Sequence, residues 1–146
     1  MFSVNRFFIK LSICCLSVAS FSLAYAEVNY QEQIKTYVRC EALQNVVASI
    51  LSDSEEEFFQ HELHHAANDS NVIAKHLTRI GDYREEVLDE LYLIYLDEFQ
   101  NDLLKRAENG EANLFMQDAR PQLDRCEELN ELQADIIQRS KEEDQS

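Results

Sequence analysis

Residues that break regular structure are nearly absent from this chain, and their scarcity limits its fold more than any other feature. The 146-residue sequence holds two glycines, Gly81 and Gly110, and one proline, Pro121. A sheet built from hairpins needs such residues at its turns, because they supply the backbone angles that tight turns use. All three fall where helices should end or begin. We therefore expect an all-α fold.

Apolar residues recur every three or four positions along most of the chain, the spacing that places them on one face of a helix. Predicted helices cover residues 30–51, 54–67, 72–80, 83–107 and 112–119, and a last helix covers 123–136. A polar run at 68–71 interrupts the pattern, so 54–67 and 72–80 form two helices or one bent helix. With 54–80 as one bent helix, and with the short helix at 112–119 either counted or left out, the result is a small bundle of four to five helices.

Two signals locate helix starts inside the chain. Ser54 with Glu57 forms a capping box for the second helix, and Asp82 with Glu85 marks the start of the helix at 83–107. The run at 91–96 could instead be a buried strand, but its acidic flanks and continuing spacing favour helix. Four further apolar residues are expected to face the core, namely Phe58, Phe59, Ile94 and Leu104.

The first 26 residues have the three parts of a secretory signal peptide. Arg6 and Lys10 make the start basic, an apolar stretch covers 11–23, and small residues, Ala24 and Ala26, occupy the third-last and last positions. The stretch is shorter than the roughly 20 residues that span a bilayer, which disfavours an uncleaved anchor. We expect cleavage after Ala26, one domain over 27–146 without membrane insertion, and export to the periplasm of a Gram-negative bacterium or, otherwise, secretion.

Acidity limits the kinds of partner. The formal charge is −15, and losing Arg6 and Lys10 with the signal peptide takes it to −17. Such a charge repels phosphate backbones and anionic membrane surfaces, so no nucleic-acid partner is expected. A basic protein or a cation fits better, and solubility alone is the plain alternative.

Two cysteines, Cys40 and Cys126, remain after export. In an oxidising compartment they are expected to form one disulfide, because they have neither redox-motif spacing nor a third cysteine nearby. Each lies within the apolar stripe of its helix, so the bond should join the first helix to the last. It would close a loop of about 90 residues, which in the chain-entropy model stabilises the fold by roughly 4.5 kcal/mol.

The segment His61-Glu62-Leu63-His64-His65 matches the pattern H-E-x-x-H. On a helix, residues four apart lie one turn above each other, so His61 and His65 can bind one zinc or other divalent ion. Glu62 can then polarise a water at the open coordination position.

A third protein ligand is needed for catalysis, and the candidates are Glu85, Glu86, Glu90 and His76. His76 would lie about 16 Å beyond His65 along an unbroken helix, so it could join only if the chain turns between them. Three interpretations stay open, namely a solvated helix face, a non-catalytic divalent-metal site that binds or senses metal, and a zinc-dependent hydrolase.

No Gly-rich phosphate loop or nucleophile elbow accompanies this pattern. The sequence therefore predicts, first, a non-enzymatic exported binding or accessory protein whose acidic helical surface engages a protein partner in the cell envelope. Tyr92 and Phe115 are candidate exposed aromatic residues for that contact. A metallopeptidase-type hydrolase and a metal-binding protein are the alternatives.

Overall fold

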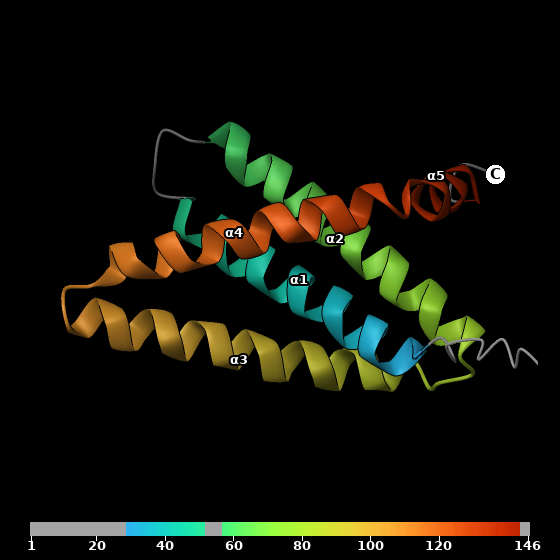
Figure 1. Cartoon of the computed structure of the whole chain (residues 1–146), viewed down its shortest axis with the longest axis horizontal. Coiled ribbons are helices and arrows are strands. Elements are labelled where there is room, and N and C mark those ends of the chain that lie inside the picture. Colours follow the sequence, from blue (N-terminus) through green and yellow to red (C-terminus); the bar gives the residue numbers. More distant parts are fainter. Residues whose placement is uncertain (1–28, 52–56, 144–146) are drawn as a thin grey trace, which may run out of the picture.

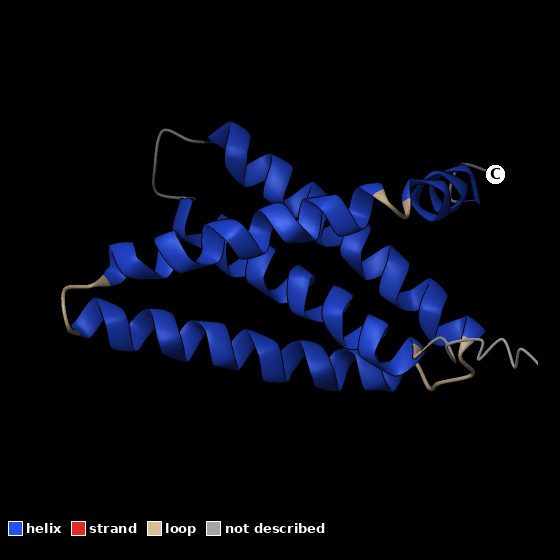
Figure 2. Cartoon of the chain, in the orientation of Figure 1, coloured by secondary structure: helices blue, strands red, loops and turns tan. Residues whose placement is uncertain are grey.

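The described residues, 29–51 and 57–143 of a computed structural model, form five helices and contain no strand (Figures 1 and 2). The helices are α1 (Tyr30–Leu51), α2 (Glu57–Ile80), α3 (Glu86–Glu108), α4 (Ala112–Glu131) and α5 (Ala134–Glu143). The all-α prediction is confirmed, and so is the helix favoured over a strand at 91–96, since that run lies within α3. The expected signal peptide and the Ser54 cap lie outside the described residues.

Helix α1 is the centre of the bundle, with α2, α3 and α4 all packed against it (Figure 1). Its bounds are those that the sequence predicts. The single apolar stripe expected for it is too narrow, because Val38, Ala42, Val46 and Ala48 are buried as well. A helix that is apolar on most sides needs neighbours around it, which explains its central position.

Helix α2 is continuous through the polar run at which the sequence suggests an interruption. Ser70, in the middle of that run, is fully buried. Its Oγ lies 3.1 Å from both Oε1 of Gln44 on α1 and Oδ1 of Asn130 on α4. Polar residues continue a helix when their side chains find partners in the interior, so this run marks a contact and does not mark a break.

Helix α2 ends at Ile80, as expected, but α3 begins three residues later than predicted. Asp82 adopts φ 55°, the left-handed conformation that closes a helix, and the Tyr83 amide donates to the Thr78 carbonyl over 3.0 Å. Asp82 therefore terminates α2 and cannot start α3. Helix α3 begins at Glu86, and Glu85 makes no side-chain capping bond.

Two predictions about the last third of the chain are wrong. Pro121 lies inside α4, exposed to solvent, so the expected short helix and last helix are one element. The chain then turns at Leu132 and Gln133, and α5 follows as a separate helix. The Gln133 amide bonds to the Asn130 carbonyl over 3.0 Å in that turn.

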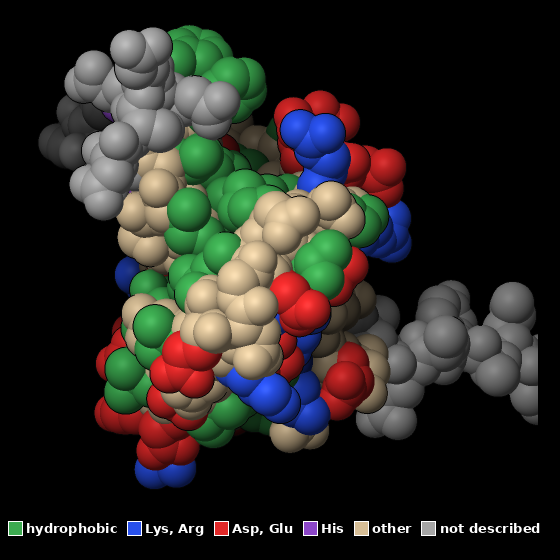
Figure 3. Space-filling model, turned by 90° about the vertical axis from the view of Figure 1, so that its left-hand side faces the viewer, with side chains coloured by type: hydrophobic (Ala, Val, Ile, Leu, Met, Phe, Trp, Pro, Cys, Tyr) green, Lys and Arg blue, Asp and Glu red, His purple; other side chains and the backbone are tan. Residues whose placement is uncertain are grey.

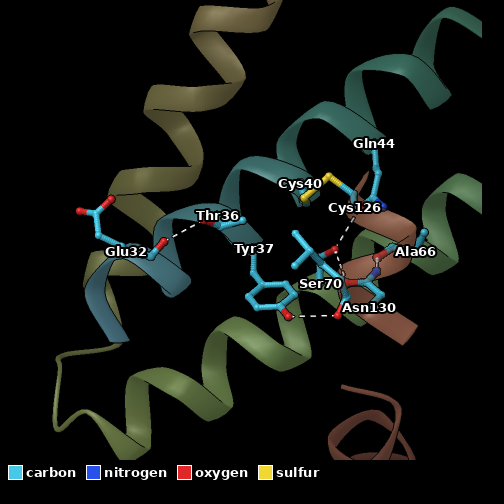
Figure 4. Close-up of a disulfide and its surroundings, with 10 residues drawn as sticks. Glu32, Thr36, Tyr37, Cys40, Gln44, Ala66, Ser70, Cys126 and Asn130 are labelled. Atoms are coloured by element: carbon cyan, nitrogen blue, oxygen red, sulfur yellow. Dashed lines mark hydrogen bonds between the residues drawn. A yellow bond between two sulfur atoms is a disulfide. The ribbon is translucent and has the colours of Figure 1, made fainter. Parts of the chain in front are cut away.

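A disulfide joins Cys40 and Cys126, as predicted, with the two Cα atoms 5.6 Å apart (Figure 4). It links α1 to α4. The prediction that it joins the first helix to the last is wrong, because the turn at Leu132 adds α5 after the helix that carries Cys126.

Polar contacts next to the disulfide connect α1, α2 and α4 through the interior (Figure 4). Tyr37 donates its hydroxyl to the Leu129 carbonyl over 3.1 Å, and Asn130 donates Nδ2 to the Ala66 carbonyl over 3.0 Å. Gln44, Ser70 and Asn130 are at most 7% exposed. We call these three side chains, with Tyr37, the polar layer. The apolar core forms two clusters, one containing Ile73 and Tyr37 and the other containing Phe115.

Several residues predicted for the core lie on the surface. Phe58 is 70% and Phe59 58% exposed, while Ile94 is 59% and Leu104 60% exposed. Figure 3 shows apolar side chains gathered over the end of the bundle where α2 begins. None of the helices in the described part of the chain is long and apolar enough to cross a membrane.

Candidate functional site

The histidines of the H-E-x-x-H pattern lie on the exposed first half of α2. The ring centroids of His61 and His65 are 4.4 Å apart, as expected for residues one turn apart, and the ring planes are tilted by 43°. Both side chains and that of Glu62 are exposed. Two imidazoles at this separation could contact one metal ion, with the remaining positions open to solvent.

His64 points to a neighbour within the protein. Its Nδ1 lies 3.3 Å from Oδ1 of Asn45 on α1, and Nδ2 of Asn45 donates to the Tyr92 hydroxyl on α3 over 3.3 Å. The middle histidine therefore belongs to a polar contact that joins α2, α1 and α3. Tyr92, expected as an exposed aromatic residue, is half-buried by it.

The proposed third metal ligands do not come to the histidine pair. Because α2 is unbroken, His76 lies about 16 Å from His65 along the helix axis. Glu85 contacts Arg79, 3.5 Å away at the far end of α2, and Glu86 and Glu90 follow it at the start of α3. Over residues 29–51 and 57–143, no three His, Cys, Asp or Glu side chains gather closely enough to hold a metal ion.

Two ionisable groups have pKa values displaced by the interior. Burial raises the pKa of the Tyr37 phenol, against the hydrogen bond with the Gln133 side chain and the charge of Arg125. Burial also raises the pKa of the Glu41 carboxyl, opposed by a hydrogen bond from Asn71 and by the Lys75 charge. Both groups lie at contacts between helices and interact with other side chains of this chain, so we assign them structural roles.

Helix α3 presents the most distinctive surface. One side packs on α1 and α4, and the opposite side lies at the boundary of the molecule (Figure 1). On that outer side, Leu93 and Leu104 are 63% and 60% exposed. Eleven positions separate them, which is three helical turns, so they share one line about 16 Å long. Ile94 lies beside it, 59% exposed.

Acidic residues alternate with these leucines. Glu86, Glu90, Asp97 and Glu108 fall on the same line by helical spacing, and all four are exposed. We call these four, with Leu93, Ile94 and Leu104, the α3 outer face. Acidic side chains are also visible in the lower part of Figure 3, the level at which α3 lies.

The acidic groups of α3 differ in what they contact. Glu98 pairs with Arg39 over 3.0 Å, and Asp102 pairs with Arg106 over 3.0 Å, both at the edge that meets the bundle. No ion pair between described residues includes the acids of the outer face. The negative charge of α3 is therefore neutralised toward the bundle and left uncompensated toward solvent.

Sequence reasoning missed this face because it assigned Ile94 and Leu104 to the core. It also offered Phe115 as an exposed residue, whereas Phe115 is 3% exposed in the interior. One sequence signal could have revealed the face. Leu93 and Leu104 are eleven residues apart and so share one side of a helix, and Asp97 lies between them on that side. A core stripe does not carry a carboxylate between two leucines.

Comparison of the chain with protein-family models, with curated protein sequences and with solved structures gives no match.

Proposed function

We propose that this protein is an exported, non-enzymatic binding or accessory protein that engages a protein partner of the cell envelope through the α3 outer face. One observation carries the proposal. Two leucines, each about 60% exposed, alternate with four carboxylates that form no ion pair within the described chain.

This surface is unfavourable to leave in water and poorly suited to self-association. Burying an exposed leucine stabilises a complex by about 1.5–3 kcal/mol, so two of them supply a useful anchor. The carboxylates would repel an identical face, because like charges brought together at an interface cost several kcal/mol. A partner segment with apolar side chains flanked by Lys or Arg satisfies both requirements.

Site-specific photo-crosslinking in intact cells tests the proposal. A photoreactive residue replaces exposed Gln100 on α3, and a second variant carries it at exposed Asp124 on α4. We expect a discrete adduct from position 100 and none of that size from position 124. Adducts from position 124 alone would refute the assignment of the face.

A matched pair of double variants then tests the anchor. Leu93→Ser/Leu104→Ser should weaken the complex about tenfold or more, since both apolar contacts are lost. Ile80→Ser/Leu132→Ser removes two apolar side chains that are 52% and 73% exposed elsewhere. It should leave the adduct intact. Equal effects of both pairs would mean that general apolar exposure, and not this face, drives binding.

The charges contribute mainly to the rate of association and its salt dependence. Glu90→Gln/Asp97→Asn should slow association with the purified partner and flatten its dependence on ionic strength. Asp124→Asn/Glu127→Gln removes the same charge from α4 and should change neither. An unchanged salt dependence in the α3 variant would exclude charge complementarity.

The separation of His61 and His65 supports a second candidate function, the binding of one divalent metal ion. Two exposed imidazoles with ring centroids 4.4 Å apart offer two neutral nitrogen ligands of the kind that zinc, copper and nickel accept. A zinc-dependent hydrolase would use the same pair with Glu62 as the group that activates water. That function needs a further ligand that the described residues do not bring to the pair.

Metal analysis of the protein purified without chelators separates these possibilities. Binding at the pair predicts stoichiometric metal that His61→Ala/His65→Ala removes and that a control variant, His76→Ala, retains. A hydrolase predicts in addition a metal-dependent peptidase activity that Glu62→Gln abolishes. Metal that persists in the double-histidine variant would refute both.

A further inference from the structure

The second half of α2 and helix α5 enclose a cleft of about 310 Å³ whose charge is opposite to that of the protein. Lys75 and Arg79 from α2 and Arg139 from α5 line it, together with His76. Glu143 is its one acidic lining residue. The chain as a whole has 28 Asp and Glu against 13 Lys and Arg, so this cleft concentrates a charge that is scarce elsewhere.

We propose that this cleft is a binding site for a small, soluble phosphate monoester. Apart from His76, the lining side chains carry three positive charges and one negative charge. A phosphate monoester carries about −1.5 to −2 at pH 7, which matches the two positive charges left within the lining. A single carboxylate would leave one of them uncompensated. Outside the lining, Lys75 also faces Glu41 and Arg79 contacts Glu85.

The cations come from two helices, so they can approach an anion from different sides. Arg79 and Arg139 present planar guanidinium groups, whose paired N–H donors fit the oxygens of a phosphate. Nε of Arg139 donates to the Asp135 carbonyl over 3.1 Å, a bond that orients the guanidinium and does not use its terminal amino groups. Arg79 contacts Glu85 at 3.5 Å, with both side chains about two-thirds exposed, a pairing that solvent makes weak.

In a second cleft, by contrast, the arginines already form ion pairs with carboxylates of the protein. This cleft has a volume of about 350 Å³ between α1, α3 and α4 and contains Arg39 and Arg106. Arg39 lies 3.0 Å from Glu98, while Arg106 lies 3.0 Å from Asp102 and 2.8 Å from Asp118. Its cations already have carboxylate partners, so an anion has little to gain there.

The remaining walls suit the organic part of such a ligand. Val72 and Ile136 supply apolar surface, and Ser140 and Asn71 supply polar groups. A few convergent polar side chains beside apolar surface, in a volume near 300 Å³, are typical of small-molecule sites. Outside the lining, Lys141 is compensated by Asp69 at 3.5 Å.

Titration of the purified, oxidised protein with inorganic phosphate and with glycerol 3-phosphate at low ionic strength tests the proposal. Backbone amide NMR signals report where each anion binds. We expect saturable shifts confined to residues 68–79 and 136–143, and tighter binding of the monoester than of inorganic phosphate. Acetate and chloride at the same ionic strength should give no saturable shifts in these ranges.

Two double variants of equal charge locate the binding. Arg79→Gln/Arg139→Gln should weaken glycerol 3-phosphate binding about tenfold or more, since both charge-assisted contacts are lost. Arg84→Gln/Arg120→Gln removes two exposed arginines elsewhere and should leave the affinity within a factor of about two.

Three results would overturn the proposal. The first is the absence of saturable binding by either phosphate compound. The second is acetate binding as tightly as phosphate, which would refute the match to a dianion. The third is binding only to phosphatidic acid in vesicles, which would assign the phosphate group to a lipid surface. None of these depends on a protein partner, so failure here and failure of the α3 outer face are separate outcomes.

Discussion

Reduction of the Cys40–Cys126 disulfide should remove a large part of the stability of the fold. The bridge connects residues separated by 86 positions, so reduction releases about 4.5 kcal/mol of loop-closure entropy into the unfolded chain. Domains of this kind are stable by about 5–15 kcal/mol in total. The reduced protein is therefore expected to be only marginally stable against unfolding at 25 °C.

Contacts next to the bridge decide whether the reduced chain stays folded. The polar layer holds α4 to α1 and α2 without the sulfurs, through Tyr37 with Leu129, Ser70 with Asn130, and Asn130 with Ala66. Because most hydrogen bonds contribute about 0.5–1.5 kcal/mol net, these offset only part of the loss. We expect lower stability with the same helices, and not a different fold.

Urea unfolding of residues 27–146, followed by circular dichroism with and without reductant, measures the difference. The variant Cys40→Ala/Cys126→Ala is the control, because reductant should not change its unfolding curve. Oxidised and reduced wild-type curves that agree within about 1 kcal/mol would refute the entropy argument. Two free thiols in the oxidised protein by mass spectrometry would refute the bridge itself.

Three further substitutions test local features of the fold. Pro121→Ala should stabilise the protein by roughly 1–2 kcal/mol in urea unfolding, because alanine restores a main-chain donor inside α4; a loss of stability would show that the ring is needed there. Asp82→Gly should raise the free energy of unfolding, since glycine adopts φ 55° freely, whereas Asp124→Gly, inside α4, should lower it by about 0.3 kcal/mol. Changes of the same sign in urea unfolding would contradict this account. Glu41→Gln should stabilise the fold at neutral pH, because the pKa of this carboxyl is raised and the folded state therefore loses stability as pH rises from 4.5 through that pKa, while glutamine can still accept the hydrogen bond from Asn71. The gain in free energy of unfolding should vanish below pH 4.5, and a gain independent of pH would refute the assignment.

Local sequence patterns were sufficient for the helix class, the bounds of α1, the end of α2 at Ile80 and the pairing of the two cysteines. Each depends on information within a few residues, or, for the cysteines, on the expectation that Cys14 and Cys15 leave with the signal peptide. The start of α3 was misplaced because Asp82 supports two local structures, a helix cap and a left-handed helix end. The observed one also needs the contact between Tyr83 and the Thr78 carbonyl.

The candidate sites were harder to predict. The H-E-x-x-H spacing correctly places His61 beside His65, but spacing along a helix says nothing about what another helix brings to them. The α3 outer face escaped because Ile94 and Leu104 resemble core residues in a periodic pattern. The cleft between α2 and α5 has no sequence motif, since its two arginines, Arg79 and Arg139, lie far apart along the chain.

Backbone preference, residue count and charge are enough to specify a helical chain with one possible disulfide and an acidic surface, because none of these properties needs a three-dimensional arrangement. Packing of the helices determines which apolar side chains are covered, that the polar run at 68–71 continues α2, and that the chain turns after Asn130. These outcomes depend on long-range partners, above all the meeting of Ser70 with Gln44 and Asn130, and no local window of the sequence contains all three.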